Sequence, residues 1–321
     1  MNNLKFSVLV QMDDINSVNP RTDSTYQIIQ EALHQRFIVM FNFQNDIFVE
    51  NGKSKVIAQR LFLDNDKSIK IKTNSKKIFN VDDFDVVLIR QDPPLNMNYI
   101  TNTYLIDIQN TQLNKKPFFI NSPSSLRNFS EKIFPLIFPK LVPVTLITSN
   151  KVKMFDFLLK YKQIVIKPLY EKGGNGIKIL KNNETQNYQI LKDASNNFTS
   201  SIVLQKYLSN IKKGDKRVLL INGEPAGAVN RVPPRGNFKA NLNLGGKAEK
   251  TTLSVKERKI CKTLKPYLQK NNFFFVGIDI IDEKLTEINV TSPTGICQIN
   301  ELDNVKLERK FWIEVRKKLN G

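Results

Sequence analysis

The chain has 321 residues, 40% of them hydrophobic and 25% charged, which is typical of a globular protein long enough to bury a substantial core. One histidine and two cysteines exclude a disulfide framework, a histidine-based triad and a histidine-rich zinc site. The net charge of +19 favours anionic ligands, but the lysines are spread over the whole chain, so nucleic-acid binding is not expected as the main function.

Strand and helix patterns alternate over the first third of the chain. Short apolar runs that predict buried strands occur at residues 6–10, 37–41, 85–90 and 117–121. A helix is expected to begin at Ser24 with Asp23 as its N-cap, and a second helical pattern covers residues 98–112. This alternation predicts an α/β layer with a mostly parallel sheet.

A polar turn follows the third of these strands. Arg90, Gln91 and Asp92 lead into two prolines where the strand ends. Open α/β sheets bind ligands at the carboxyl ends of their strands, so Arg90 and Asp92 are candidate substrate contacts. A surface turn with a local ion pair is the alternative.

The pattern changes near residue 123, where we place a domain boundary. Helices are expected at residues 122–134, 152–160, 254–268 and 307–318. Short strands are expected at residues 145–150, 164–169, 176–180, 201–205 and 216–223. Strands therefore dominate the second half of the chain.

A glycine-rich turn joins two of these strands. Lys167 lies in the first strand, and Gly173, Gly174 and Gly176 follow it. The turn is not a dinucleotide fingerprint, which needs a helix after the glycines, and it is not a Walker loop. It can fold over a triphosphate with Lys167 as a point charge, and a plain hairpin turn is the alternative.

The next strand meets residues 205–208, where the chain changes direction. An exposed strand edge at this point would offer backbone groups to an adenine ring, with Leu208 packing on its face.

Two arginines flank the segment that follows. Arg217 lies with Asp215 at the start of a strand, and Arg231 precedes a stretch rich in Gly, Pro and Asn. Because residues 232–244 have few apolar anchors, we expect a mobile loop that closes over bound substrate.

Residues 277–290 predict a hairpin with a polar face. With a turn at residues 282–284, Asp279 lies opposite Glu287, and Asn289 shares their face. Oxygen ligands without His or Cys suit Mg²⁺, which completes its shell with substrate phosphates. A solvated hairpin face is the alternative.

Several stretches resemble the bacterial type of glutathione synthetase, an ATP-grasp ligase family. The first group is KPLYEKGGNGI, GDKRVLLINGEP, NLGG and FVGIDIIDEKLTEINVTSPTGI. The segments MDDINSVNPRTDST, VVLIRQDPP and NSPSSLRNFSEKIF also resemble the family in matching order. The similarity therefore covers nearly the entire chain.

The resemblance implies an ATP-grasp fold with an N-terminal Rossmann-like α/β domain. That domain would span residues 1–123 and the ATP-grasp domain 124–321, with a glycine-loop part to about residue 205 and a metal-binding part after it. Members of the family join γ-glutamylcysteine to glycine with ATP, using Mg²⁺ or alternatively Mn²⁺, and the family suggests a homotetramer. Because no apolar run reaches membrane-spanning length, we expect a cytoplasmic protein without membrane contacts.

The resemblance also implies roles for individual residues. Nucleotide contacts are expected from Lys132, Lys167, Gly173, Gly174, Gly176, Gln205, Lys206, Tyr207, Leu208 and Asp215. Substrate contacts are expected from Ser24, Arg90, Asp92, Asn241, Gly245, Gly246, Ser292, Pro293 and Thr294. Arg217 and Arg231 would stabilise charge during catalysis, and the metal ligands would be Asp279, Glu287 and Asn289.

Four residues depart from the family pattern near the expected substrate pocket. Lys239 and Ala240 stand where Arg and Gly are often found, Gln298 stands where Arg is common, and Gln91 replaces a Lys. These departures leave open a related ATP-grasp ligase that acts on a different carboxylate or amine. A non-catalytic basic RNA-binding protein is an alternative of another class, and it predicts steep salt dependence without nucleotide turnover.

Overall fold

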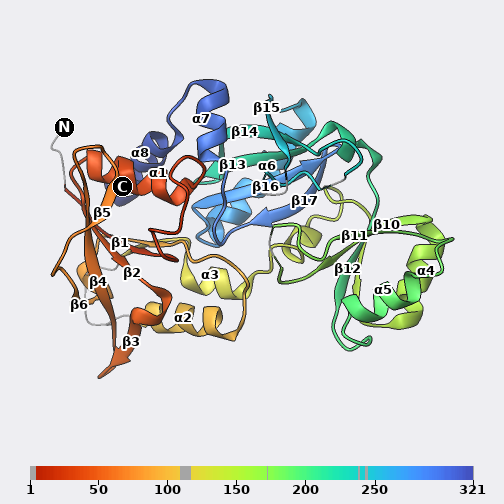
Figure 1. Ribbon diagram of the computed structural model, residues 1–321, viewed down its shortest axis with the longest axis horizontal. Coiled ribbons are helices and arrows are strands. Elements are labelled where there is room, and N and C mark those ends of the chain that lie inside the picture. The colour runs from red at the N-terminus through yellow and green to blue at the C-terminus, as the bar shows by residue number, and fades with distance from the viewer. Residues whose placement is uncertain (1–4, 109–116, 172, 238, 243–244, 321) are drawn as a thin grey trace.

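The computed structural model describes residues 5–108, 117–171, 173–237, 239–242 and 245–320. These residues form three β-sheets that follow one another along the long axis of the molecule (Figure 1). An eight-stranded sheet lies at one end, a five-stranded sheet in the middle and a four-stranded sheet at the other end.

The eight-stranded sheet is half parallel and half antiparallel. Its parallel strands are β1 (Ser7–Gln11), β2 (Ile38–Asn42), β7 (Val86–Ile89) and β8 (Phe118–Ile120). Its antiparallel strands are β3 (Ile47–Glu50), β4 (Lys53–Leu63), β5 (Ile69–Ile71) and β6 (Lys77–Asn80). The expectation of a mostly parallel sheet is therefore wrong for the second group. Buried residues along β4 alternate with more exposed ones, so β4 has no continuous apolar run to mark it as a strand.

Two helices of this region confirm the sequence pattern only in part. Helix α1 (Ser24–His34) begins at the predicted residue, and the Asp23 carboxylate accepts a hydrogen bond from the Tyr26 N–H. Helix α2 (Met97–Asp107) is shorter than predicted, and residues 109–112 of that prediction lie outside the described residues.

The four-stranded sheet is antiparallel and has a core of its own. Its order is β11 (Lys178–Lys181), β10 (Gln163–Pro168), β12 (Ile202–Lys206) and β9 (Thr145–Thr148). Helices α4 (Lys151–Tyr161) and α5 (Asn187–Ala194) pack on it, and α5 was not predicted. Met154, Ile164 and Leu204 belong to a buried cluster that includes no residue of the other two sheets.

The five-stranded sheet shares its core with the N-terminal sheet. Its order is β15 (Lys247–Lys250), β14 (Glu224–Val232), β13 (Asp215–Ile221), β16 (Phe275–Ile281) and β17 (Lys284–Asn289). Its helices are α6 (Val255–Lys270), α7 (Ile296–Asp303) and α8 (Leu307–Asn320). Trp312 of α8 is fully buried, and its indole N–H donates to the Ile28 carbonyl of α1 at 2.8 Å. Strands β14 and β15 and helix α7 were not predicted.

The segment between the sheets is not the single helix that was predicted for residues 122–134. Helix α3 (Pro123–Asn128) is followed by an extended residue, Phe129, and a 3-10 helix covers Phe134–Ile137. The Ser122 side chain makes no capping hydrogen bond to the helix backbone. The predicted helix is interrupted because this segment contacts β17, where the Ile288 N–H donates to the Glu131 carbonyl at 3.1 Å.

The hairpin of β16 and β17 reaches the predicted pairing by a different route. Its turn consists of Asp282 and Glu283, with φ angles of 52° and 57°, and is one residue tighter than predicted. A β-bulge beside Asp279 then shifts the register by one residue. Asp279 therefore pairs with Glu287, as predicted, because the two deviations cancel.

Within the described residues, no helix combines the length and the apolar character needed to cross a membrane.

Candidate functional site

A cavity of about 670 Å³ is lined by residues of both the four-stranded and the five-stranded sheet. Most predicted site residues line it: Asp92, Lys132, Lys167, Gly173, Gly174, Gln205, Lys206, Tyr207, Leu208, Asp215, Arg217, Arg231, Asn241, Asp279, Glu287, Asn289, Ser292, Pro293 and Thr294. The cavity thus brings together segments that are far apart in the sequence.

Two residues that were predicted to contact substrate, Ser24 and Arg90, form hydrogen bonds to the backbone at the start of α7 and just before it. The Ser24 hydroxyl accepts hydrogen bonds from the N–H groups of Gly295 and Ile296 at 3.1 and 3.2 Å. The buried Arg90 guanidinium donates to the Pro293 carbonyl at 2.9 Å. Arg90 also lines a second hollow of about 410 Å³, together with Asp92 and Ser292.

Three predicted glycines pack against backbone or proline atoms and do not line the cavity. A Cβ atom on Gly176 would lie 2.6 Å from a Pro168 ring carbon, and one on Gly246 would lie 2.2 Å from the Ala240 carbonyl oxygen. The Gly245 N–H donates to the Leu242 carbonyl at 3.1 Å. These contacts give the glycines a role in shaping the two loops.

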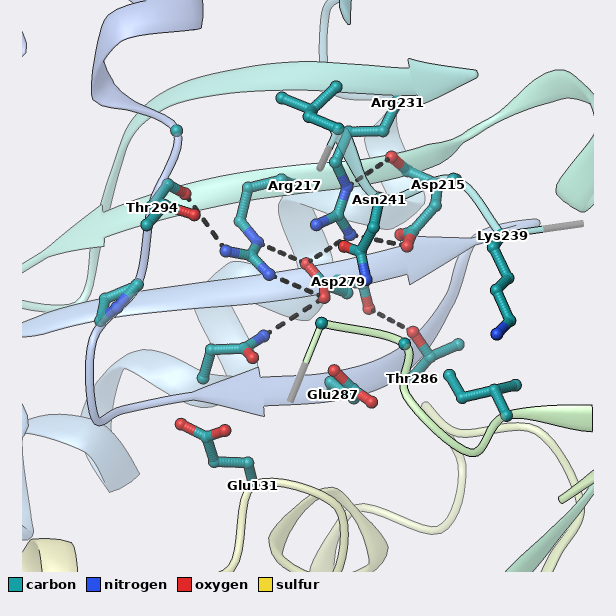
Figure 2. Close-up of a pocket in the computed structure, with 18 of the residues that line it drawn as sticks. Glu131, Asp215, Arg217, Arg231, Lys239, Asn241, Asp279, Thr286, Glu287 and Thr294 are labelled. Carbon is teal, nitrogen blue, oxygen red and sulfur yellow. Dashed lines mark hydrogen bonds and ion pairs between the residues drawn. The ribbon is translucent and has the colours of Figure 1, made fainter. Parts of the chain in front are cut away.

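An ion-pair cluster forms the wall on the five-stranded sheet. Asp279 of β16 binds Arg217 of β13 in a bidentate pair, Nε–Oδ1 at 2.5 Å and Nη2–Oδ2 at 2.9 Å. Arg231 of β14 lies 3.0 Å from Asp279 Oδ1 and 2.6 Å from Asp215 Oδ2 (Figure 2). Each of the two arginines is therefore fixed by a carboxylate on a neighbouring strand.

Burial and pairing set the charges of this cluster. Burial alone would raise the pKa of Asp279, but Arg217 and Arg231 outweigh it and hold that pKa below its usual range. Burial raises the pKa of Asp215 to about 6, although Arg231 acts in the opposite direction. Burial would lower the pKa of Arg231, but Asp215 and Asp279 raise it, so Arg231 keeps its charge.

Oxygen atoms beside this cluster fit a hard divalent cation. Within the described part of the chain, the partly exposed Glu287 carboxylate has no hydrogen-bond or ion-pair partner. Asn289 Nδ2 donates to Asp279 at 3.2 Å and to the Gly277 carbonyl at 3.3 Å, which leaves Asn289 Oδ1 available as an acceptor. The described residues hold no cluster of three or more His, Cys, Asp or Glu, so such an ion would take its other ligands from phosphate and water.

Glu131 is a cavity residue that the sequence analysis missed. Its Oε1 accepts hydrogen bonds from the Val290 N–H at 2.8 Å, the Thr291 N–H at 3.1 Å and the Thr291 hydroxyl at 2.9 Å. Burial raises its pKa, and these three hydrogen bonds act in the opposite direction. Nothing in the sequence pairs this residue with a strand end 159 positions away.

Two lysines line the cavity together with the glycine turn. The Lys132 ammonium donates to the Glu171 carbonyl at 2.5 Å and the Leu169 carbonyl at 3.4 Å, just before the turn. The Lys167 side chain is on β10, 8% of the residue is exposed, and no described residue forms a hydrogen bond or ion pair with its ammonium. A largely buried cation that faces a cavity without a protein counter-charge indicates an anionic ligand.

The strand edge expected at residues 205–208 is not open. Strand β12 is paired on both sides, and the N–H groups of Lys206 and Tyr207 donate to the Val144 and Gln163 carbonyls. These two donors are therefore not available to an adenine ring. Apolar side chains that line this part of the cavity are Val165, Ile177 and Leu208.

The loop expected at residues 232–244 lies partly outside the described residues, at 238, 243 and 244. Lys239 to Leu242 line the cavity, and Ala240 is buried. The described part of the loop therefore covers the site, and its mobility stays a prediction.

Solved structures of low sequence identity share this architecture. A D-cycloserine synthetase matches with a TM-score of 0.67 over 97% of this chain and 99% of that chain, at 12% identity. The ATP-grasp ligase PsnB matches with a TM-score of 0.60 over 98% and 99%, at 16% identity. At these identities the likeness concerns the fold, and the fold is that of the ATP-grasp proteins.

Sequence comparison places the chain more narrowly. The family described as "Prokaryotic glutathione synthetase, ATP-grasp domain" matches residues 131–304, and its N-terminal domain matches residues 6–127. The chain is 36% identical to the glutathione synthetase of Mesorhizobium japonicum over 98% of this chain and 99% of that protein. It is also 36% identical to that of Coxiella burnetii, over 96% and 95%. The chain belongs to the prokaryotic glutathione synthetase family, and it is an ATP-dependent ligase.

Proposed function

We propose that this protein joins γ-glutamylcysteine to glycine at the expense of ATP, and releases glutathione, ADP and phosphate. Membership of the family supports the reaction. The structural observation that carries the proposal is the charge arrangement of the cavity. Lys167 lacks a described counter-charge on one wall, and Glu287 and Asn289 offer oxygen atoms on the other.

The nucleotide is proposed to lie along the four-stranded sheet. Its adenine ring would pack on the apolar side chains Val165, Ile177 and Leu208, next to the direction change at residues 205–208. Its phosphates would meet Lys167, Lys132 and the glycine turn. Gly173 and Gly174 have φ angles of 67° and 81°, a region that other residues rarely adopt, so the turn can bring backbone close to a phosphate.

The metal ion is proposed to be Mg²⁺, with Mn²⁺ as the alternative. Asp279, Glu287 and Asn289 would hold it, with Asp279 shared with the two arginines. A divalent cation bound there neutralises phosphate charge on the nucleotide.

The reaction is proposed to pass through an acyl phosphate. The terminal carboxylate of the dipeptide attacks the γ-phosphorus of ATP, an O–P bond forms and ADP leaves. Arg217 and Arg231 stabilise the negative charge that gathers as the two anions meet, and Asp279 holds both guanidinium groups in place. The amine of glycine then attacks the acyl carbon, loses a proton, and phosphate leaves with one oxygen of the original carboxylate.

The substrate end of the cavity is proposed to be formed by Ser292, Thr294, Asn241 and Asp92. Arg217 Nη1 donates to the Thr294 carbonyl at 3.1 Å, so the arginine cluster also fixes this turn. Because water hydrolyses an acyl phosphate, the covering residues 239–242 would protect the intermediate.

A homotetramer in the cytoplasm is proposed from the family resemblance, and light scattering in solution tests the tetramer.

The experiment that tests the function is a substrate panel. ADP release and peptide product are measured together, with γ-glutamylcysteine and each of several amines, and with other dipeptides and glycine. We expect ADP and glutathione in equal amounts with the pair γ-glutamylcysteine and glycine. Equal or higher turnover with a different carboxylate or amine would assign the chain to another ATP-grasp reaction.

A further inference from the structure

We propose that Glu131 is a positioning residue for the metal-binding hairpin. By holding the backbone on both sides of Asn289, it orients the oxygen of that side chain toward the bound cation. The inference rests on the proposed role of Asn289 as a metal ligand, and it assigns a function to a side chain that does not itself belong to the ligand set.

The first observation is the place of β17 in its sheet. β17 is an edge strand, paired with β16 on one side only. Its outward N–H groups therefore need acceptors from outside the sheet. One such N–H group belongs to Ile288 of β17, and the N–H of Val290, the residue directly after the strand, has the same need; the two residues flank Asn289.

Glu131 provides the acceptors for both. Its main-chain carbonyl accepts from the Ile288 N–H at 3.1 Å, and its carboxylate accepts from the Val290 N–H at 2.8 Å. The same carboxylate oxygen accepts from the N–H and the hydroxyl of Thr291. The carboxylate thus accepts three hydrogen bonds and the main-chain carbonyl a fourth, so one residue fixes the backbone before and after Asn289.

A second residue, Asn121, holds the carbonyl side of the peptide bond between Val290 and Thr291. Asn121 is buried, and its Nδ2 donates to the Val290 carbonyl at 2.6 Å. Its Oδ1 accepts from the N–H groups of Phe274 and Phe275, where β16 begins. With Asn121 in place, the strand end keeps its fold when Glu131 is lost, and what changes is the freedom of the backbone around Asn289.

The partners of metal ligands typically contribute about 10- to 100-fold in metal affinity, because they hold the ligand in its binding orientation. We therefore expect Glu131→Ala to weaken metal binding by about 10- to 100-fold. Glu131→Gln keeps an acceptor oxygen and is expected to weaken it by no more than about threefold.

The control is Glu308→Ala. Glu308 is a buried glutamate of α8 that accepts from the Asn300 side chain at 2.5 Å and does not line the cavity. It matches Glu131 in residue type and in accepting a side-chain hydrogen bond, and its loss tests whether removal of any such carboxylate would give the same result.

The experiment measures Mn²⁺ binding to the complex of full-length enzyme and ADP by electron paramagnetic resonance. Hydrogen–deuterium exchange of peptides that cover residues 284–292 is followed in the same samples. We expect faster exchange and weaker Mn²⁺ binding for Glu131→Ala, near wild-type values for Glu131→Gln, and unchanged Mn²⁺ binding for Glu308→Ala.

Two results would overturn the proposal. Mn²⁺ binding by Glu131→Ala within about twofold of the wild type would show that Glu131 does not position the metal site. A comparable loss in Glu308→Ala would show a general structural effect. If the wild-type complex itself binds no Mn²⁺, the proposed metal site falls as well, and this outcome is distinguishable from the other two because it appears before any substitution is made.

Discussion

The two walls of the cavity carry charge in different ways. On the five-stranded sheet, Arg217 and Arg231 share the Asp279 carboxylate and are buried. On the four-stranded sheet, Lys167 has no partner among the described residues, and it lies on a sheet with a separate core. The first wall is organised before a ligand binds, whereas under the proposed function the second wall would gain its counter-charge from the nucleotide.

Because of this difference, substitutions in the two walls should affect different properties of the protein, its stability in one case and its nucleotide binding in the other. Breaking the paired wall leaves an uncompensated buried charge, so it should lower the free energy of unfolding as well as activity. Removing the unpaired lysine should lower nucleotide binding alone. The predictions below test that separation.

The largest effect on stability is expected from Arg217→Met. Asp279 loses its bidentate partner and keeps Arg231 and the Asn289 amide, so we expect the free energy of unfolding to fall by about 3 kcal/mol. Urea denaturation measures it. If the free energy of unfolding falls by less than about 1 kcal/mol, the pair is as weak as an exposed ion pair, and the two walls do not differ in their contribution to stability.

Glu287→Gln is expected to lower turnover by about 100-fold or more while the fold is kept, because one carboxylate is lost where phosphate charge gathers. The matched control is Glu283→Gln in the turn of the same hairpin, where the carboxylate binds Ser254 and Lys256 and does not line the cavity. Rates of ADP release over a range of Mg²⁺ concentrations measure both. If the two variants behave alike, Glu287 is not a metal ligand.

Lys167→Met is expected to weaken ATP binding by about 10- to 100-fold, since a charged hydrogen bond to phosphate contributes about 1.5–3 kcal/mol. The free energy of unfolding should be unchanged or raised, because a buried cation without a described partner is removed. Lys178→Met, an exposed lysine on the neighbouring strand β11, is the control. Calorimetric titration measures the affinity for ATP. If both variants bind ATP with the same affinity, the glycine turn is a plain hairpin turn and not a phosphate-binding loop.

The smallest effect concerns pH and Asp215. Burial raises its pKa to about 6, so the folded protein holds this proton more tightly than the unfolded chain. The stabilisation is fully present below about pH 4 and is lost as the pH rises through about 6. The Asp215→Asn variant lacks this pH dependence. The free energy of unfolding of the variant, relative to that of the wild type, should therefore increase by on the order of 1–3 kcal/mol between about pH 4 and about pH 7. Denaturation at several pH values checks this, and a constant difference would contradict the raised pKa.

The hairpin shows what the sequence can and cannot provide. The assumed turn at residues 282–284 placed Asp279 opposite Glu287, and the structure confirms this pair although the turn itself is different. The tight turn at Asp282 and the compensating bulge could not be predicted, since their energies differ little from those of the simpler hairpin.

Contacts between distant segments were the main source of error. Glu131 gave no signal because its partners lie on a strand end far along the chain. Ser24 and Arg90 hold the backbone before α7, a role that the sequence did not predict, and their expected contact with substrate stays a prediction. The four antiparallel strands from residues 47 to 80 contain apolar runs of no more than three residues, because one face of that part of the sheet is more exposed. Local patterns thus predicted the residue types of the site better than the packing that supports them.

The most direct test of the account follows the oxygen atoms. The terminal carboxylate of γ-glutamylcysteine is labelled with ¹⁸O, and the phosphate released with glycine and ATP is analysed by mass spectrometry. If the carboxylate attacks the γ-phosphorus to form an acyl phosphate, each phosphate released with glutathione carries one ¹⁸O atom. Unlabelled phosphate, formed in step with glutathione, would contradict an acyl-phosphate ligase.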